Sequence, residues 1–407
     1  MVSRSETRRK ALLLQGPIGS FFKTVIQVLE RDGYDAFQVA FNAGDLVNAR
    51  WRNTYCYNKG REKWRAWLQQ FLTDKAITIV ILFGSERYHH KVARELCEAL
   101  RIPVLSLEEG YVRPGYITAE WGGNNWTSPV ANLPVSTITK MKRSKNPSRI
   151  TMKNFGKVVW LGFLYFNIRA LGRPYFSQAM YHKTRPVGPE ALKWICNYYR
   201  WQTGRKRNRK IVNSLIGPLK RKFFLVPLQV SDDQQLTEAG RGWTNDRLIN
   251  QTVSSFLSHA PSDSLLVFKL HPMERGHSND LSRIQELAAR NNAGDRILVI
   301  DDGPLGELVK VSRGMITINS TSGLSALSHY VPVGVLGEAI YRRPELVTCM
   351  ENQADIDRFW TTAETGDPKI AQGLRNCLYQ MALLPGDYYL RAYQLVAAEG
   401  ILKKISQ

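Results

Sequence analysis

Short apolar runs alternate with helix-like segments along the first quarter of this chain. Runs with the length and β-branched content of buried strands occur at 11–15, 34–41, 77–83 and 103–107. Apolar residues three and four positions apart, the spacing of an amphipathic helix, occur at 21–31 and 86–100. This alternation predicts a parallel sheet with helices on its faces.

The same alternation resumes at residue 223. Strands are predicted at 223–227, 265–270, 297–300, 314–318 and 333–336. Helices are predicted at 246–259, 281–291, 305–311, 323–329 and through most of 370–405. Two such halves predict an α/β chain of the GT-B type, in which two Rossmann-like domains face each other across a cleft.

We therefore expect an N-terminal Rossmann-like domain over 1–139, a basic helical linker over 140–222 and a C-terminal Rossmann-like domain with C-terminal helices over 223–407. No GxSxG elbow and no GxGxxG fingerprint occurs in the sequence. The absence of both motifs disfavours a hydrolase and a dehydrogenase.

The positive charge of the chain is concentrated in the predicted linker. The chain has 407 residues and a net charge of +21, and residues 140–222 alone hold 21 Lys and Arg against one acid, Glu190. Eleven aromatic residues are mixed with these charges between Trp160 and Trp201. Such a mixture suits the headgroup region of an anionic membrane, which we favour. A solvated helical insert and a single-stranded nucleic-acid site are the alternatives.

No segment reaches the ~20 apolar residues that a membrane-spanning helix needs. The N-terminal stretch 1–15 is basic but has a short apolar core, 11–14, so it is interpreted as a first strand and not as a signal peptide. Five cysteines are scattered with no metal or redox spacing. We expect a cytoplasmic protein with no metal and no cofactor, peripheral on the inner face of the membrane.

Three polar motifs follow predicted strands directly. They are Glu108-Glu109-Gly110, Lys269-Leu270-His271-Pro272 and Asn319-Ser320-Thr321-Ser322-Gly323. The carboxyl ends of parallel strands form the ligand-binding edge of a sheet, so each motif is predicted to line a site. Carboxylates, a histidine and a hydroxyl-rich helix start together suit group transfer from a phosphate-activated donor.

Each motif also has a plainer interpretation. Ser320, Thr321 and Ser322 can be an ordinary helix cap, but their place at a strand end favours a phosphate site. His271 can be a structural strand-end residue or can donate a proton to a leaving phosphate. One of Glu108 and Glu109 can act as a base while the other braces the loop, and a solvated acidic turn is the alternative.

Loops after other strands are weaker candidates. Gln15 and Gly16 follow the first strand, and Asn42 and Asp45 follow the second, so they are candidates for an acceptor pocket or for ordinary turns. Asp233 follows the strand at 223–227, and a carboxylate there could attack a sugar carbon. From its spacing alone, this segment is no better than a loop.

The motifs together resemble those of the capsule polysaccharide β-Kdo transferases of Gram-negative bacteria, of the short KpsS type. The resemblance runs nearly end to end. It is carried by LLLQGPIGSFF (12–22), FNAGD (41–45), EEGYVRPGYITAEWGG (108–123), FFLVPLQVSDDQQL (223–236), FKLHPMERG (268–276), INSTSGLSAL (318–327) and GEAIY (337–341). The histidine-proline and Ser/Thr motifs are also similar to those of bacterial sialyltransferases.

This resemblance implies a GT-B enzyme that uses CMP-β-Kdo and transfers β-Kdo, with retention, to a phosphatidylglycerol-type lipid at the inner membrane. It implies Asp233 as the nucleophile and Glu108 or Glu109 as the acid/base. Residues that would hold the donor are Lys269, His271, Pro272, Asn319, Ser320, Thr321 and Ser322, with Arg113 and Arg275 as candidates for the Kdo carboxylate. The expected partners are anionic phospholipid and other capsule proteins, and nucleic acid is not expected.

Two alternatives remain open. A non-catalytic component of capsule export or assembly is disfavoured because a scaffold has no need of intact Glu109, Asp233 and His271. A transferase for another CMP-activated acidic sugar would use the same site.

Overall fold

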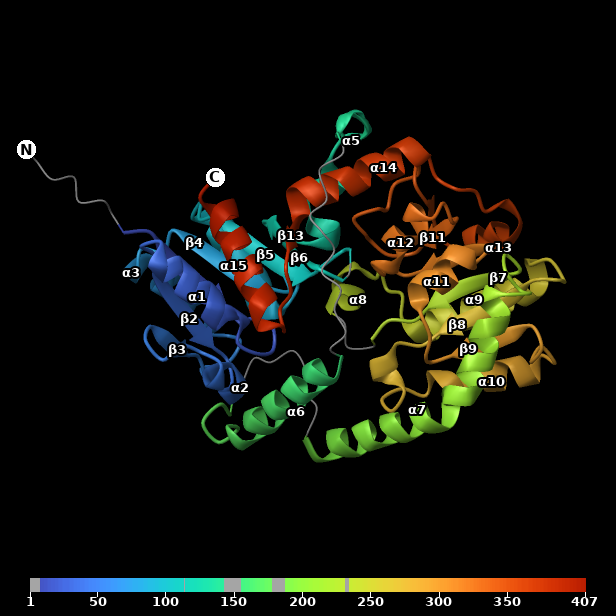
Figure 1. The fold of residues 1–407 in the computed structure, drawn as a ribbon, viewed down its shortest axis with the longest axis horizontal. Coiled ribbons are helices and arrows are strands. Elements are labelled where there is room, and N and C mark those ends of the chain that lie inside the picture. The colour runs from blue at the N-terminus through green and yellow to red at the C-terminus, as the bar shows by residue number, and fades with distance from the viewer. Residues whose placement is uncertain (1–7, 113, 143–154, 178–186, 231–233) are drawn as a thin grey trace, which may run out of the picture. The chain divides into compact units, whose positions relative to one another are not determined.

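The computed structural model describes residues 8–112, 114–142, 155–177, 187–230 and 234–407. The chain divides into two compact units, each of which is described by itself (Figure 1). The first unit consists of Met1–Asn132, Arg143–Val187 and Leu378–Gln407, and the second of Leu133–Lys142 and Gly188–Cys377.

The first unit contains a seven-stranded sheet with the order β13-β6-β5-β4-β1-β2-β3. Strands β1 to β5 are parallel, whereas β6 is antiparallel to both of its neighbours. The order reverses between β1 and β4, which makes that gap the switch point of the sheet. The strands are β1 (Lys10–Leu14), β2 (Asp35–Ala40), β3 (Thr54–Cys56), β4 (Ile79–Phe83), β5 (Val104–Glu109), β6 (Tyr116–Trp121) and β13 (Leu383–Pro385).

Strand β1 shows why this sheet needs helices on both faces. Successive side chains of a strand point to opposite faces, so Leu12 and Leu14 pack in one core while Ala11 and Leu13 pack in the other. Amphipathic helices cover both cores, and α1 and α15 pack together on the Ala11 side. The helices are α1 (Phe21–Arg31), α2 (Ala43–Val47), α3 (Trp64–Asp74), α4 (Tyr88–Ala99), α6 (Phe155–Leu171) and α15 (Arg391–Ile405), with shorter turns η1 (Asn125–Thr127), η2 (Pro129–Asn132) and η4 (Leu378–Ala382).

The second unit contains a six-stranded, fully parallel sheet with the order β12-β11-β10-β7-β8-β9. Counted from β7, this is the Rossmann order 3-2-1-4-5-6, with its switch point between β7 and β10. The strands are β7 (Phe223–Pro227), β8 (Leu265–Lys269), β9 (Ile297–Ile300), β10 (Gly314–Thr317), β11 (Val333–Val335) and β12 (Thr348–Cys349).

The core of the second unit is rich in aromatic side chains. Phe224, Phe256 and Trp360 pack edge to face, which adds to the stabilisation from apolar burial. The helices are α5 (Val135–Lys140), α7 (Val187–Ile216), α8 (Gln234–Ala239), α9 (Asn245–His259), α10 (Asp280–Arg290), α11 (Leu305–Val311), α12 (Ser322–Ser328), α13 (Gln353–Thr362) and α14 (Pro368–Cys377), with a turn η3 (Pro272–Glu274).

The predicted two-fold alternation of strands and helices is confirmed, since every predicted strand is present. Four strands, β3, β6, β12 and β13, had no apolar run strong enough to predict them. The predicted linker, 140–222, contains α6 in the first unit and α7 in the second. No helix in the described ranges is long and apolar enough to cross a membrane.

The predicted C-terminal domain, 223–407, differs from the structure at its end. Residues from Leu378 onward return to the first unit, where β13 pairs with β6 and α15 packs beside α1 (Figure 1). The reason is burial: Ala397, Ala398 and Ile401 fill the core on the α1 face. A helical pattern predicts that a buried face exists but does not identify the sheet that covers it.

This assignment predicts the effect of Ile401→Ala. Deleting a fully buried isoleucine side chain costs about 2–5 kcal/mol, and the loss falls on the unit that buries it. Hydrogen exchange of β1 and β4 should accelerate while that of β7 and β8 stays unchanged. Leu395→Ala, on the same helix at an exposed position, is the control. Faster exchange confined to β7 and β8 would contradict the assignment.

Candidate active site

The switch point of the second unit is held by a pair of side-chain amides. Gln229 follows β7, and Asn319 follows β10. Gln229 Nε2 donates to Asn319 Oδ1 at 2.9 Å, and the Asn319 backbone N–H donates to Gln229 Oε1 at 3.3 Å. Asn245 Nδ2 donates to the Gln229 carbonyl at 2.8 Å. These bonds fix the two loops at the position where Rossmann sheets bind ligands.

The Ser/Thr motif starts α12 next to this amide pair. The Ser320 hydroxyl accepts from the backbone N–H of Ser322 at 3.3 Å, so Ser320, and not the N-cap residue Thr321, supplies the side-chain cap. Tyr341 donates its phenol to the Ser320 carbonyl at 2.6 Å. A Cβ at Gly323 would lie 2.2 Å from the Tyr341 ring, so this contact requires glycine. The segments INSTSGLSAL (318–327) and GEAIY (337–341) thus pack against each other.

His271 lies at the carboxyl end of β8, the neighbour of β7 on the other side. Its Nδ1 accepts from the Met273 backbone N–H at 3.3 Å. The neutral ring therefore carries its proton on Nε2, which makes that nitrogen the donor. Pro272 is the first residue of the η3 turn, where its missing N–H costs no hydrogen bond.

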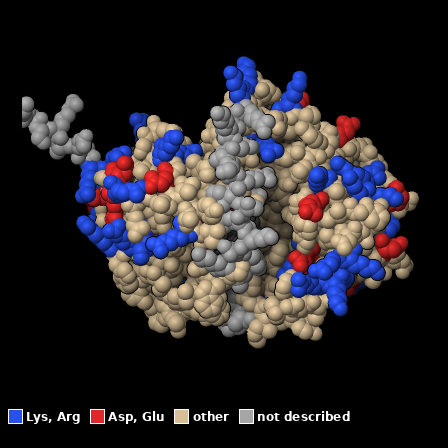
Figure 2. Space-filling model, viewed as in Figure 1, with Lys and Arg blue, Asp and Glu red and all other residues tan. Residues whose placement is uncertain are grey.

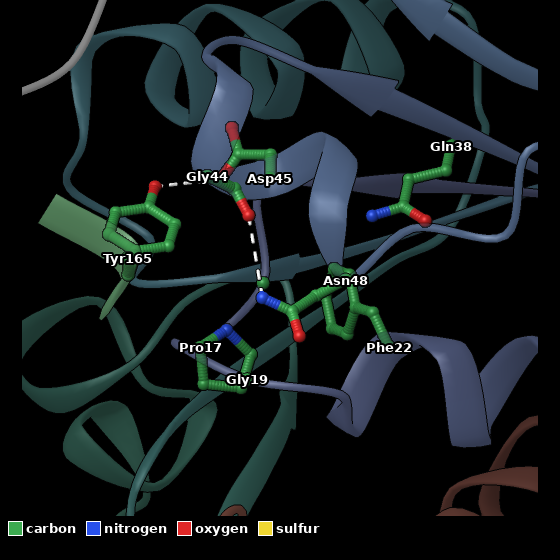
Figure 3. A pocket seen from close by; sticks show the side chains of 9 residues that line it. Pro17, Gly19, Phe22, Gln38, Gly44, Asp45, Asn48 and Tyr165 are labelled. Carbon is green, nitrogen blue, oxygen red and sulfur yellow. Dashed lines mark hydrogen bonds between the residues drawn. The ribbon is translucent and has the colours of Figure 1, made fainter. Parts of the chain in front are cut away.

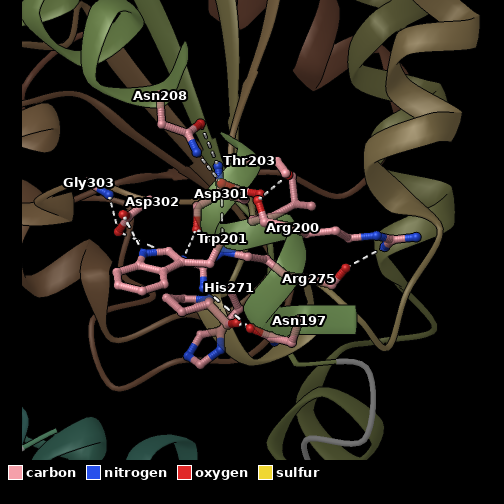
Figure 4. A network of polar contacts seen from close by, with 12 residues as sticks. Asn197, Arg200, Trp201, Thr203, Asn208, His271, Arg275, Asp301, Asp302 and Gly303 are labelled. Carbon is pink, nitrogen blue, oxygen red and sulfur yellow. Dashed lines mark hydrogen bonds and ion pairs between the residues drawn. The ribbon is translucent and has the colours of Figure 1, made fainter. Parts of the chain in front are cut away.

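A network between α7 and the loops after β8 and β9 supports His271 (Figure 4). Arg275 is buried, and its Nε and Nη2 donate to the Asp301 carbonyl at 3.1 and 2.7 Å. Its Nη1 donates to Asn197 Oδ1 at 3.4 Å, and Asn197 Nδ2 donates to the Pro272 carbonyl at 2.9 Å. All three guanidinium nitrogens of Arg275 thus bond within the protein, which favours a positioning role over the predicted role as a sugar-carboxylate ligand.

The same network anchors α7 further along its length. Trp201 Nε1 donates to Asp302 Oδ2 at 3.0 Å, and Asn208 Nδ2 donates to Asp301 Oδ1 (Figure 4). Asp301 and Asp302 follow β9 as the predicted motifs follow their strands. The strand-end rule therefore also applies to this pair, which the sequence interpretation overlooked.

Lys269, the last residue of β8, is buried beside this network. Its Nζ donates to the Leu270 carbonyl at 2.9 Å. Burial, together with the nearby Arg275 charge, lowers the pKa of Lys269 to about 8. Asp302 and Asp301 act in the opposite direction. A lysine in this state can hold a proton or release one near neutral pH.

In the first unit, both predicted carboxylates lie at the end of β5. The Glu108 side chain accepts from the backbone N–H of Glu109 at 3.0 Å, so it braces its own loop. Tyr388 donates to the Glu108 carbonyl at 2.7 Å, and Tyr389 donates to Glu109 Oε1 at 3.0 Å. A Cβ at Gly110 would lie 2.2 Å from the Tyr116 carbonyl oxygen, so the sharp exit from β5 requires glycine.

A buried carboxylate stands behind this loop. Tyr111 donates its phenol to Glu120 Oε2 at 2.6 Å and accepts from the Asn125 backbone N–H at 2.6 Å. Ser128 donates to Glu120 as well. Burial raises the pKa of Glu120, against the lowering effect of these hydrogen bonds. Through Glu120, strand β6 is therefore hydrogen-bonded both to Tyr111 and to Ser128.

A small pocket lies at the carboxyl ends of β1 and β2 (Figure 3). Asp45 is at its centre and accepts from the Phe41 backbone N–H and from Asn42 Nδ2, both at 3.0 Å. Gln15 Nε2 lies 3.4 Å from the same carboxylate. Burial raises the pKa of Asp45. The structure thus brings the predicted acceptor residues Gln15, Gly16, Asn42 and Asp45 to one place.

The pocket also contains a residue that was assigned to the linker. Tyr165 of α6 donates to Asp45 Oδ1 at 2.7 Å and accepts from Asn42 Nδ2 at 2.8 Å. A Cβ at Gly44 would lie 2.6 Å from the Tyr165 ring. Nothing in the local sequence predicts this contact, because 120 positions separate Tyr165 from Asp45. The remaining lining residues are Pro17, Gly19, Phe22, Gln38 and Asn48.

Helix α6 is buried through Tyr165 and exposed on other sides. Trp160 is 62% exposed and Phe163 58%, and their rings stack on each other. Residues 192, 195, 198 and 199 of α7 are also exposed and apolar or aromatic. Figure 2 shows Lys and Arg in several clusters on the visible face, with fewer Asp and Glu among them. On α7, the exposed apolar and aromatic residues are followed along the helix by the exposed Arg205, Lys206 and Arg207.

The predicted residues therefore fall into three groups, each within one unit. His271 and Asn319–Ser322 lie at the ends of β8 and β10, Glu108 and Glu109 at the end of β5, and the Asp45 group at the ends of β1 and β2. Asp233 and Arg113 lie outside the described residues. Within the described ranges, no group of three or more His, Cys, Asp or Glu has the arrangement of a metal site.

Known proteins give this arrangement a context. A family model described as capsule polysaccharide biosynthesis protein matches residues 78–389. The chain belongs to this family. It is 32% identical over 391 residues to the capsule polysaccharide export protein KpsS of Escherichia coli, covering 94% of this chain and 97% of the relative. The resemblance inferred from the motifs is thereby confirmed.

Two further similarities extend the comparison. The capsule polysaccharide modification protein LipB of Neisseria meningitidis serogroup A is 28% identical over 402 residues, with 95% of this chain and 93% of the relative covered. Among solved structures, KpsC of Thermosulfurimonas dismutans, a β-Kdo 2,7 transferase, matches with a TM-score of 0.44 and 13% identity over 97% of this chain and 100% of that chain. A structural likeness at that level supports no conclusion about activity.

The low pKa of Lys269 predicts how stability depends on pH. The unfolded chain keeps this proton up to about pH 10.5 and the folded chain loses it near 8, so the free energy of unfolding rises with pH between these values. The full effect of this group is about 3 kcal/mol. Lys269→Met removes it, so the stability gained by the variant over wild type at pH 7 should shrink toward pH 10. A difference that is constant with pH, measured by urea unfolding, would contradict the assignment.

Proposed function

We propose that this protein is a retaining glycosyltransferase that moves Kdo from CMP-β-Kdo to a (lyso)phosphatidylglycerol lipid, which starts the linker of a capsule polysaccharide. The observation that carries the proposal is the arrangement of three neighbouring strands in the second unit. His271 follows β8, Ser320 follows β10, and β7 between these two strands leads along the chain to Asp233. Family membership supplies the capsule context.

The described groups suit the departure of CMP. The Nε2 proton of His271 can pass to the leaving phosphate oxygen as the bond from the anomeric carbon to that oxygen breaks. Ser320 and Ser322 offer hydroxyl groups at a strand end, where Rossmann sheets bind phosphates. Lys269 supplies a cation that can respond to the charge of the donor.

Retention requires two displacements. In the first, the Asp233 carboxylate attacks the anomeric carbon and CMP leaves, which forms a glycosyl ester. In the second, a lipid hydroxyl attacks the same carbon, the ester bond breaks, and Glu109 accepts the hydroxyl proton. Each step inverts the carbon, so the product has the β configuration of the donor.

An anionic membrane surface is the proposed location of the acceptor. The exposed Trp160 and Phe163 suit an interfacial position, and the basic residues of the linker suit anionic headgroups. The name of the E. coli relative, an export protein, supports the competing proposal of a non-catalytic role in capsule assembly. The two proposals differ in whether CMP is released.

Release of CMP from CMP-Kdo in the presence of lysophosphatidylglycerol should be catalysed by the wild-type protein. His271→Ala should lower the rate about 10²–10⁴-fold, because the leaving phosphate loses its proton donor. His329→Ala, at an exposed position of the same unit, should have no effect. If well-folded protein releases no CMP, the enzyme proposal is wrong. If it turns over CMP-sialic acid but not CMP-Kdo, the enzyme proposal stands with CMP-sialic acid as the donor.

Mass spectrometry of the intact protein and its peptides tests whether Asp233 is the nucleophile. Active protein incubated with CMP-Kdo but no acceptor should gain one Kdo on the peptide that contains Asp233, and Asp233→Asn should abolish both the adduct and transfer. Asp232→Asn is the matched control, one position away, and should keep both. An adduct on Asp232 or Glu109, or no adduct under any condition, counts against Asp233.

A further inference from the structure

We propose that Tyr389 positions Glu109 for its reaction with the acceptor, which makes the C-terminal stretch a working part of the catalytic site. This inference rests on the proposed function. It adds a residue that no strand-end motif includes and that lies 280 positions from Glu109 in the sequence. The contact itself is the Tyr389 phenol donating to Glu109 Oε1 at 3.0 Å.

The backbone around Tyr389 is fixed by a turn. Asp387 Oδ1 accepts from the Tyr389 N–H at 2.6 Å and from the Leu390 N–H at 2.9 Å, which is the pattern of an Asx turn. Gly386 precedes this turn at φ +138°, a conformation that favours glycine. Directly before Gly386, strand β13 is hydrogen-bonded to β6. The phenol of Tyr389 therefore starts from a well-defined backbone position.

Tyr388 fastens the turn to the carboxyl edge of the sheet. Its buried ring packs edge to face on Phe21 and Phe83, with ring centroids 4.8 and 5.1 Å away. The Tyr388 phenol donates to the Glu108 carbonyl, and Gln394 Nε2 donates to the backbone carbonyl of Tyr388 at 2.6 Å. The two tyrosines thus bond to consecutive residues of β5, one to the backbone and one to the side chain.

This division of contacts assigns Tyr389 a function beyond packing. Tyr388 and the β5–β6 pairing already hold the backbone of Glu109. The bond from Tyr389 acts on the side chain, where it limits the rotation of the carboxylate. A base that receives a proton from the lipid hydroxyl needs its carboxylate oriented before the hydroxyl attacks.

The two half-reactions separate this role from a structural one. With CMP-Kdo alone, each active molecule should release one CMP in a burst as the Asp233 ester forms, and steady release should follow only when lysophosphatidylglycerol is added. Tyr389→Phe should keep the burst and lower the steady rate about 10- to 100-fold, since a hydrogen bond to a charged group is lost. Glu109→Gln should show the same pattern more strongly.

Controls and failures are distinguishable. Tyr393→Phe removes a phenol from the same stretch and should change neither phase. If Tyr389→Phe also lowers the burst, a second variant decides. Asp387→Ala loosens the turn and must then show a full burst with slow turnover; any other result overturns the inference. A normal steady rate in Tyr389→Phe beside a slow Glu109→Gln overturns this inference alone. No burst in the wild type, or normal turnover in Glu109→Gln, overturns the proposed function itself.

Discussion

Parallel pairing of β7 with β8 on one side and β10 on the other is the constraint on which the second unit depends. This pairing brings the loops that follow three strands to one edge of the sheet. It also places the reversal of strand order between Gln229 and Asn319. The amide pair then fixes the loops at that reversal. His271 and Ser320 owe their positions at this edge to the pairing of β7 with β8 and β10.

A second layer of support comes from α7, and it changes how the basic segment is understood. Asn197, Trp201 and Asn208 bond to the loops after β8 and β9, while other residues of the helix are exposed. Helix α6 has a comparable division, with Tyr165 bonded to Asp45 and Trp160 exposed. Each half of the predicted linker is therefore joined to the candidate site of its own unit, which a purely solvated insert would not require.

Periodicity and strand-end chemistry predicted the two α/β halves and the three motifs, because strands and the residues that follow them are local features. Contacts that join distant parts of the chain left no such signal. Tyr165, Tyr389 and the return of α15 to the first unit depend on which buried surfaces meet. Arg275 shows a different case: the family resemblance implies that it is a candidate ligand of the Kdo carboxylate, which stays a prediction, while the contacts of its guanidinium nitrogens within the protein could not be predicted.

The return of the chain to the first unit has a consequence for biosynthesis. The second unit ends at Cys377, so it can fold as soon as that residue leaves the ribosome, whereas the first unit must wait for β13 and α15. Residues 1–132 are thus made early and completed last, tens of seconds later at ordinary elongation rates. During that interval the core beside α1 lacks Ile401 and its neighbours, so the apolar side chains of α1 and β1 that they cover in the finished protein are left open to water.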